Sequence, residues 1–208
     1  FLIGSILYQS YVTDSFTLQS VFRFLKRRWF RTLPNYYLVL ILNVSIAFLI
    51  GYQIENVGLY FVFLQNFLGK APAFFPESWS LSVEEFAYLL LPFVLFLGTF
   101  GIIKNKSNRF LILVSPLYII YVFAKIVINT TQTLSNLTDW NSNLKSVVIY
   151  RIDAILVGVL IAWIRFNFEA FWKKYKVLFA FVGIGIFFFL LFGITSSNLR
   201  IEQSQFFW

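Results

Sequence analysis

The fold is decided by residues 27–34, which read Arg27-Arg28-Trp29-Phe30-Arg31-Thr32-Leu33-Pro34. They stand immediately before the apolar segment 35–52, which enters the membrane as part of a predicted helix over 33–52. Arg28 and Arg31 are three residues apart, so on a helix they share a face. Two guanidinium groups on one face can grip a phosphate or a carboxylate through forked hydrogen bonds. Pro34 suits the first turn of the helix that follows.

The composition indicates an integral membrane protein. The chain is 59% hydrophobic and only 12% charged, whereas about a quarter of the residues of a soluble domain are charged. The net charge of +8 comes from 17 Lys and Arg against 9 Asp and Glu, and such a balance is also found in nucleic-acid-binding proteins. Here most basic residues form short clusters between apolar runs, which is typical of cytoplasmic loops. We therefore expect a lipid bilayer as partner and no nucleic acid.

Three residue types are missing from the sequence. It has no Cys, no His and no Met, so it can form neither a disulfide nor a Cys or His metal site, and we expect no metal. The chain begins inside an apolar run with Phe1 and ends with Trp208. We expect one membrane domain over 1–208 that is truncated at both ends.

The apolar runs predict an all-α, polytopic transmembrane helix bundle with about six spanning or re-entrant helices. Residues 1–12 are the tail of a helix, and the further predicted segments are 33–52, 57–68, 79–100, 110–128, 146–164 and 177–194. Residues 16–31 alternate apolar and basic side chains, as in an amphipathic helix at a membrane surface.

The basic clusters predict the orientation. Clusters 23–31, 104–109 and 165–176 would all be cytoplasmic. The chain must then cross an even number of times between Arg31 and Lys104. Three apolar segments lie there, and the short segment 57–68 is the one expected not to cross fully.

The three arginines allow two interpretations. They could anchor a cytoplasmic end, where any Lys or Arg would serve. They could instead bind a phosphorylated cofactor at the cytoplasmic face, and the use of Arg rather than Lys at Arg27, Arg28 and Arg31 favours this site.

A second polar motif opens the predicted helix 79–100, and it reads Trp79-Ser80-Leu81-Ser82-Val83-Glu84-Glu85-Phe86-Ala87-Tyr88. Ser82 and Glu85 have the spacing of a capping box, which predicts a helix start. Alternatively, Ser80, Glu84 and Tyr88 share one helix face. A hydroxyl, an acid and a phenol on one stripe can orient a sugar hydroxyl or a catalytic base.

Two charges, Arg151 and Asp153, lie inside the predicted span 146–164. Each destabilises an isolated span by a few kcal/mol unless it is paired. Residues two apart on a helix point in different directions, so each is expected to pair with another helix. The pair is either a structural ion pair or a functional site. Lys125 is nearer a membrane end and is expected to snorkel to the surface.

Four motifs in this order resemble the acyltransferase 3 family of integral membrane O-acyltransferases, which modify cell-surface polysaccharides. They are Phe1-Leu2-Ile3-Gly4, residues 27–37, residues 79–85 with Tyr88 and Pro92, and Arg151-Ile152-Asp153-Ala154 with Gly158. The resemblance implies a parent protein of about ten spanning helices in the bacterial inner membrane. It also implies transfer of an acyl group, usually acetyl, from acyl-CoA as co-substrate to a hydroxyl of a cell-surface or exported carbohydrate, either a glycan or a lipid-linked sugar.

The same resemblance assigns roles to individual residues. Arg28 and Arg31, with Arg27, would handle the acyl donor, and Glu84 is the glutamate of the second motif and a possible catalytic residue. From the residues themselves, the candidates for structural or acceptor-site polar roles are Trp79, Ser80, Ser82, Tyr88, Arg151 and Asp153. The catalytic His of the family is expected upstream of Phe1, so this segment alone is expected to be inactive.

Two other functional classes remain open. A polytopic transporter or flippase would use the buried charges as a substrate or proton path. A membrane scaffold without enzymatic activity is the third possibility.

Overall fold

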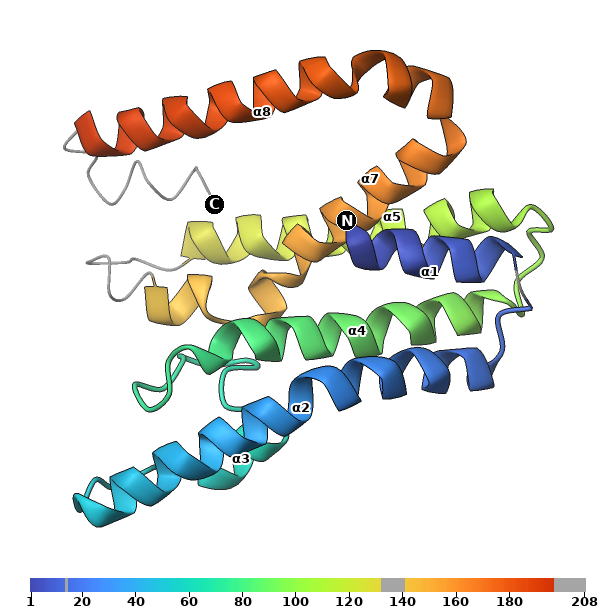
Figure 1. The fold of residues 1–208 in the computed structure, drawn as a ribbon. Helices are drawn as coiled ribbons and strands as arrows, with labels where there is room; N and C mark the ends of the chain where they lie inside the picture. Colours follow the sequence, from blue (N-terminus) through green and yellow to red (C-terminus); the bar gives the residue numbers. More distant parts are fainter. Residues whose placement is uncertain (14, 132–140, 197–208) are drawn as a thin grey trace.

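The computed structural model describes residues 1–13, 15–131 and 141–196, and these residues form helices and connecting turns without a strand (Figure 1). The all-α prediction is confirmed. In chain order the elements are α1 (Leu2–Thr13), α2 (Leu18–Leu49), α3 (Val57–Phe61), α4 (Ser78–Gly98), α5 (Lys106–Thr131), η1 (Asn141–Lys145), η2 (Val148–Tyr150), α7 (Ile152–Asn167) and α8 (Glu169–Ser196).

Three helices in the described part of the chain are long and apolar enough to cross a membrane, and they indicate a membrane protein. They are Leu18–Leu49, Ser78–Gly98 and Lys106–Val127. The expected number of about six spans is not confirmed. Helix α1 has 12 residues and α7 has 16, fewer than the roughly 20 that a span needs. The five-residue helix α3 agrees with a segment 57–68 that does not cross.

Helix α2 replaces two predicted elements. The surface helix 16–31 and the span 33–52 form one helix of 32 residues, with Pro34 inside it rather than in a first turn. The predicted break was wrong because an interior proline removes one backbone hydrogen bond without ending a helix that packing supports on both sides. Such a proline kinks a helix, and Figure 1 shows α2 changing direction near its middle.

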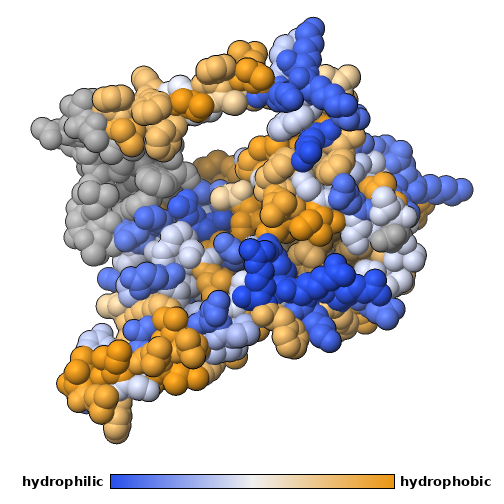
Figure 2. All heavy atoms as spheres, in the orientation of Figure 1, coloured by the Kyte–Doolittle hydropathy of each residue, from blue (hydrophilic) through white to orange (hydrophobic). Residues whose placement is uncertain are grey.

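The two halves of α2 have different surfaces. Hydrophilic atoms gather over the half nearer its N-terminus and hydrophobic atoms over the other end (Figure 2). At 1.5 Å per residue the helix is about 48 Å long, whereas the hydrocarbon core of a bilayer is about 30 Å thick. The basic half can therefore lie at the membrane–water interface while the apolar half crosses the hydrocarbon core. Thr17 starts the helix through a reciprocal capping box with Ser20.

Apolar side chains of α1, α2, α4, α5 and α7 form one core, whose fully buried members include Leu25, Leu91 and Leu156. Helix α8 combines residues 169–176 of the predicted basic segment with the predicted span 177–194, whereas Arg165 lies in the last turn of α7. It stands apart from the other helices in Figure 1, and large apolar side chains along it, such as Phe181 and Phe189, are exposed.

Helix α1 packs closely on α7 because of Gly4. A Cβ atom at Gly4 would lie 2.6 Å from the Cα of Val159 and 3.1 Å from the Cβ of Ala162. Small residues let helix backbones approach in this way, and this packing is a main source of helix association in membranes.

We predict that Gly4→Val destabilises the protein by roughly 1–3 kcal/mol, because the new methyl groups must push α1 away from α7. Thermal unfolding in detergent micelles measures the effect. Gly183→Val in α8 is the matched control, since a Cβ there meets no atom within 4 Å. Equal melting temperatures for the two variants would contradict the close contact.

Candidate functional site

A chain of hydrogen bonds joins α2 to α4, which lie side by side (Figure 1). The Arg28 Nη2 atom donates to the Tyr88 hydroxyl at 2.9 Å, and that hydroxyl donates to Oε2 of Glu84 at 2.8 Å. The Cζ atom of Arg28 also lies 4.4 Å from the centre of the Tyr88 ring. The two motifs of the sequence therefore meet in one site.

The geometry of α4 explains why this chain of hydrogen bonds ends at Glu84. Glu84 and Tyr88 are four residues apart and lie on one face of the helix. Tyr88 is 3% exposed, whereas Glu84 is exposed. The guanidinium of Arg28 polarises the phenol, and the polarised phenol donates more strongly to the carboxylate. The result is an oriented carboxylate at the surface, with free lone pairs for a further donor.

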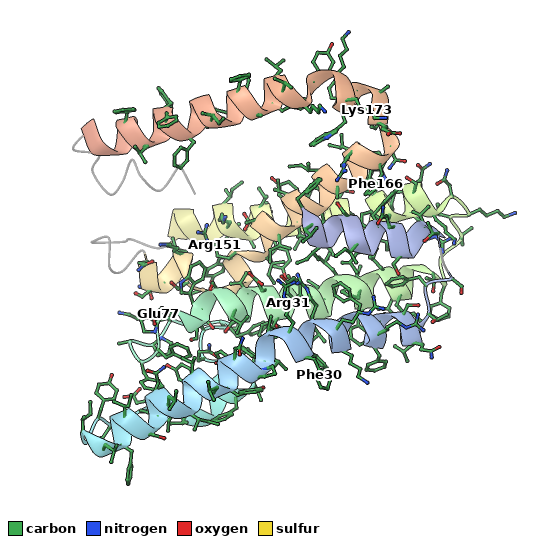
Figure 3. All side chains as sticks on the ribbon, in the orientation of Figure 1. Phe30, Arg31, Glu77, Arg151, Phe166 and Lys173 are labelled. Carbon is green, nitrogen blue, oxygen red and sulfur yellow. The ribbon has the colours of Figure 1, made fainter. Side chains whose placement is uncertain are left out.

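The other two predicted arginines are exposed. Arg27 and Arg31 belong to the N-terminal half of α2, over which hydrophilic atoms gather (Figure 2). Figure 3 shows Arg31 on the side of α2 toward α4, while Phe30 points away from α4. Of the three arginines, Arg28 is half-buried and holds Tyr88, and the other two present guanidinium groups that can bind an anion.

The predicted capping box at Ser82 and Glu85 is wrong. Helix α4 begins at Ser78, with Glu77 at the N-cap, so both residues lie beyond the first turn. Ser82 is fully buried and donates to the Ser78 carbonyl at 3.3 Å. Ser80 is exposed and donates to the Glu77 carbonyl at 3.4 Å, so it does not join the hydrogen-bond chain from α2.

Two side-chain amides that the sequence analysis did not single out fasten the segment after α3 to its neighbours. The Gln65 Nε2 atom donates to the hydroxyls of Ser82 at 2.8 Å and Ser78 at 3.1 Å. The Asn66 Nδ2 atom donates to the Ser146 carbonyl at 2.6 Å. The available signal was a pair of adjacent amides inside an apolar run, where an amide must find partners.

Arg151 and Asp153 lie at the start of a helix rather than inside a span. Helix α7 begins at Ile152, so Arg151 occupies its N-cap position and Asp153 its first turn. The predicted location was wrong, but the predicted pairing of Asp153 with another helix is confirmed. Its Oδ2 atom lies 2.6 Å from the Lys125 Nζ of α5, so the snorkelling prediction for Lys125 is wrong. The Cζ atom of Arg151 lies 6.0 Å from the Trp79 ring centre.

Glu85 is a further polar residue of this region, one that the sequence analysis assigned to a helix cap. It is 7% exposed. Its Oε2 atom accepts from the Trp29 indole nitrogen at 2.9 Å, and its Oε1 atom accepts from the Thr32 hydroxyl at 3.1 Å. Trp29 and Thr32 are three residues apart and so share the face of α2 that meets α4.

Lys125→Met should destabilise the protein by roughly 3 kcal/mol, because it removes the ammonium group that lies 2.6 Å from Asp153 among apolar helices. The double variant Lys125→Met/Asp153→Leu should regain most of that loss, and thermal unfolding in micelles measures both. Lys70→Met, at an exposed position, is the control. A neutral effect of Lys125→Met would mean that the ion pair does not form.

The described part of the chain contains no group of three or more Asp and Glu side chains that could hold a metal ion. No family model, curated protein or solved structure matches this chain. Function is therefore inferred from the contacts above and from the sequence motifs.

Proposed function

We propose that this chain is part of a membrane acyltransferase of the bacterial inner membrane. It would move an acyl group, in the first place acetyl, from acyl-CoA to a hydroxyl of a cell-surface or exported carbohydrate. The observation that carries the proposal is the hydrogen-bond chain from Arg28 through Tyr88 to Glu84. It brings together the two motifs on which the resemblance to acyltransferases most depends, and it leaves one carboxylate at the surface.

The donor would bind at the basic half of α2. Arg27 and Arg31 are exposed there, and guanidinium groups suit the phosphates of coenzyme A because they donate two parallel hydrogen bonds. Basic residues at the end of a membrane helix favour the cytoplasmic side, where acyl-CoA is dissolved. Donor binding and membrane orientation therefore use the same residues.

The acceptor chemistry would take place beside Glu84. In the reaction the acceptor hydroxyl oxygen attacks the thioester carbonyl, the C–S bond breaks, and coenzyme A leaves as the thiol. A general base takes the hydroxyl proton. The family resemblance gives that role to a histidine, and this chain contains none. Glu84 would orient the acceptor hydroxyl, and Tyr88 and Arg28 would position Glu84.

A transporter or flippase is the second candidate. Lys125 and Asp153 lie among apolar helices, where charged residues often mark a substrate path. Their direct ion pair at 2.6 Å weakens this candidate, because two charges that already neutralise each other do not require a charged substrate as a partner.

Arg27→Gln/Arg31→Gln should raise the KM for acetyl-CoA by about tenfold or more, since charge-assisted hydrogen bonds contribute at least about 1.5 kcal/mol each. Transfer of radiolabelled acetyl to glycan in membranes containing the whole protein measures this. Arg23→Gln is the matched control, an exposed arginine on the same helix. A wild-type KM for acetyl-CoA in the double variant would contradict the proposed donor site. No transfer by the wild-type protein from any acyl donor would favour a transporter.

Tyr88→Phe should lower kcat by about tenfold while the KM for acetyl-CoA stays constant, because the ring remains over Arg28 but the bond that orients Glu84 is lost. Glu84→Gln should lower kcat in the same way. Tyr52→Phe, at an exposed position outside the site, should behave as wild type. Full activity of Glu84→Gln would assign Glu84 a structural role only.

A further inference from the structure

A pocket of about 310 Å³ lies between α2, α4 and the residues at the end of α3. This volume is near the lower limit of small-molecule sites, which measure about 300–1,000 Å³. Most of its wall is aromatic, and the wall residues that matter here are Trp29, Tyr37, Phe61, Phe63, Phe86 and Glu85. Glu85 supplies the carboxyl group of an otherwise apolar wall.

The Glu85 carboxyl group has unused hydrogen-bonding capacity. Each of its oxygens accepts one bond, from Trp29 and from Thr32. A carboxylate has about four acceptor positions in total, so about two remain. Because Trp29 and Thr32 hold the group in place, its free positions have a fixed direction. A buried acceptor of this kind favours a ligand that carries hydrogen-bond donors.

The surroundings of the pocket discriminate between ligand classes. A plain acyl chain would leave the Glu85 acceptors without a donor. A second anion would be repelled by Glu85. An organic cation is disfavoured because the guanidinium of Arg28 already interacts electrostatically with the Glu85 carboxyl group. A neutral ring with hydroxyl groups on its edge and C–H bonds on its face satisfies both the carboxyl group and the aromatic wall.

The rim of the pocket is apolar and exposed. Phe61 is 40% exposed, Val62 55% and Leu89 39%, and all three line the pocket. The rim adjoins α4, which is long and apolar enough to cross a membrane, and an exposed apolar rim at such a helix suits lipid rather than water. A ligand that enters there carries an apolar chain beside its hydroxylated ring.

We infer that this pocket binds the neutral sugar ring of a lipid-linked acceptor. The ring hydroxyls would donate to Glu85, and the ring face would stack on the aromatic wall. The inference deepens the proposed function and rests on it for the role of the sugar as acceptor. Glu84 immediately precedes Glu85 on the same helix, with its carboxylate exposed, so adjacent residues would hold the ring and orient the reacting hydroxyl.

The test measures binding without any acyl donor, to the whole protein in lipid nanodiscs. Three probes share an octyl chain and differ in the head group, namely octyl β-glucoside, octanoate and octyltrimethylammonium. Titration calorimetry gives the affinities, and saturation-transfer NMR shows which probe protons contact the protein. We expect octyl β-glucoside to bind at least about tenfold more tightly than the other two probes, with its ring protons in contact.

Two variants and their controls locate the site. Glu85→Gln should weaken the binding of octyl β-glucoside by about tenfold, since one charged acceptor is lost. Glu55 is an exposed glutamate in a turn, and Glu55→Gln should leave the binding unchanged. Leu89→Trp should fill the pocket and abolish binding without touching the bonds of Glu85. Leu97→Trp, on the same helix and 64% exposed, should bind normally.

The outcomes separate this inference from the proposed function. Equal or tighter binding of octanoate or octyltrimethylammonium would overturn the sugar assignment, as would normal glucoside binding by Leu89→Trp. Failure of all three probes to bind would also overturn it. If glucoside binding fails while labelled acetyl still reaches glycan, the acyltransferase stands and the acceptor site lies elsewhere. If glucoside binds as expected but no acyl group is transferred, the sugar site stands and the acyltransferase proposal fails.

Discussion

The contact between α2 and α4 is the interaction on which the site depends. Polar side chains between membrane helices must find partners within the protein, because lipid offers none. Arg28, Trp29 and Thr32 on α2 meet Tyr88 and Glu85 on α4. These bonds can form together at only one rotation and one height of the two helices. The apolar core allows many such arrangements, and the polar bonds select one.

Two adjacent glutamates on α4 have different surroundings for a simple geometric reason. Successive residues on a helix point about 100° apart. Glu85 turns toward Trp29 and Thr32 and is buried, while Glu84 is exposed and is held by Tyr88. One short motif therefore supplies a carboxyl group for a pocket wall and another for a surface. Under the proposed function these would bind the acceptor ring and orient its reacting hydroxyl.

Helices α1, α5 and α7 and the segment after α3 hold the α2–α4 pair in place. Gly4 lets α1 approach α7, and the ion pair of Lys125 with Asp153 ties α5 to the start of α7. Asp153 also lies in the first turn of its helix, where the helix dipole favours a negative charge. Gln65 holds the segment after α3 against Ser78 and Ser82 of α4. Phe61, the last residue of α3, and Phe63 of that segment form one wall of the pocket.

The sequence by itself determined the helical class, the membrane character and the shared face of Glu84 and Tyr88, because composition and helical spacing are properties of single segments. Only the tertiary structure decided that Arg28 is the arginine that holds Tyr88, that Glu85 faces α2, and that Lys125 pairs with Asp153. Spacing shows which residues share a face of one helix, but not which faces of two helices meet. The continuity of α2 through Pro34 was likewise decided by packing on both sides of the proline, which local propensity does not contain.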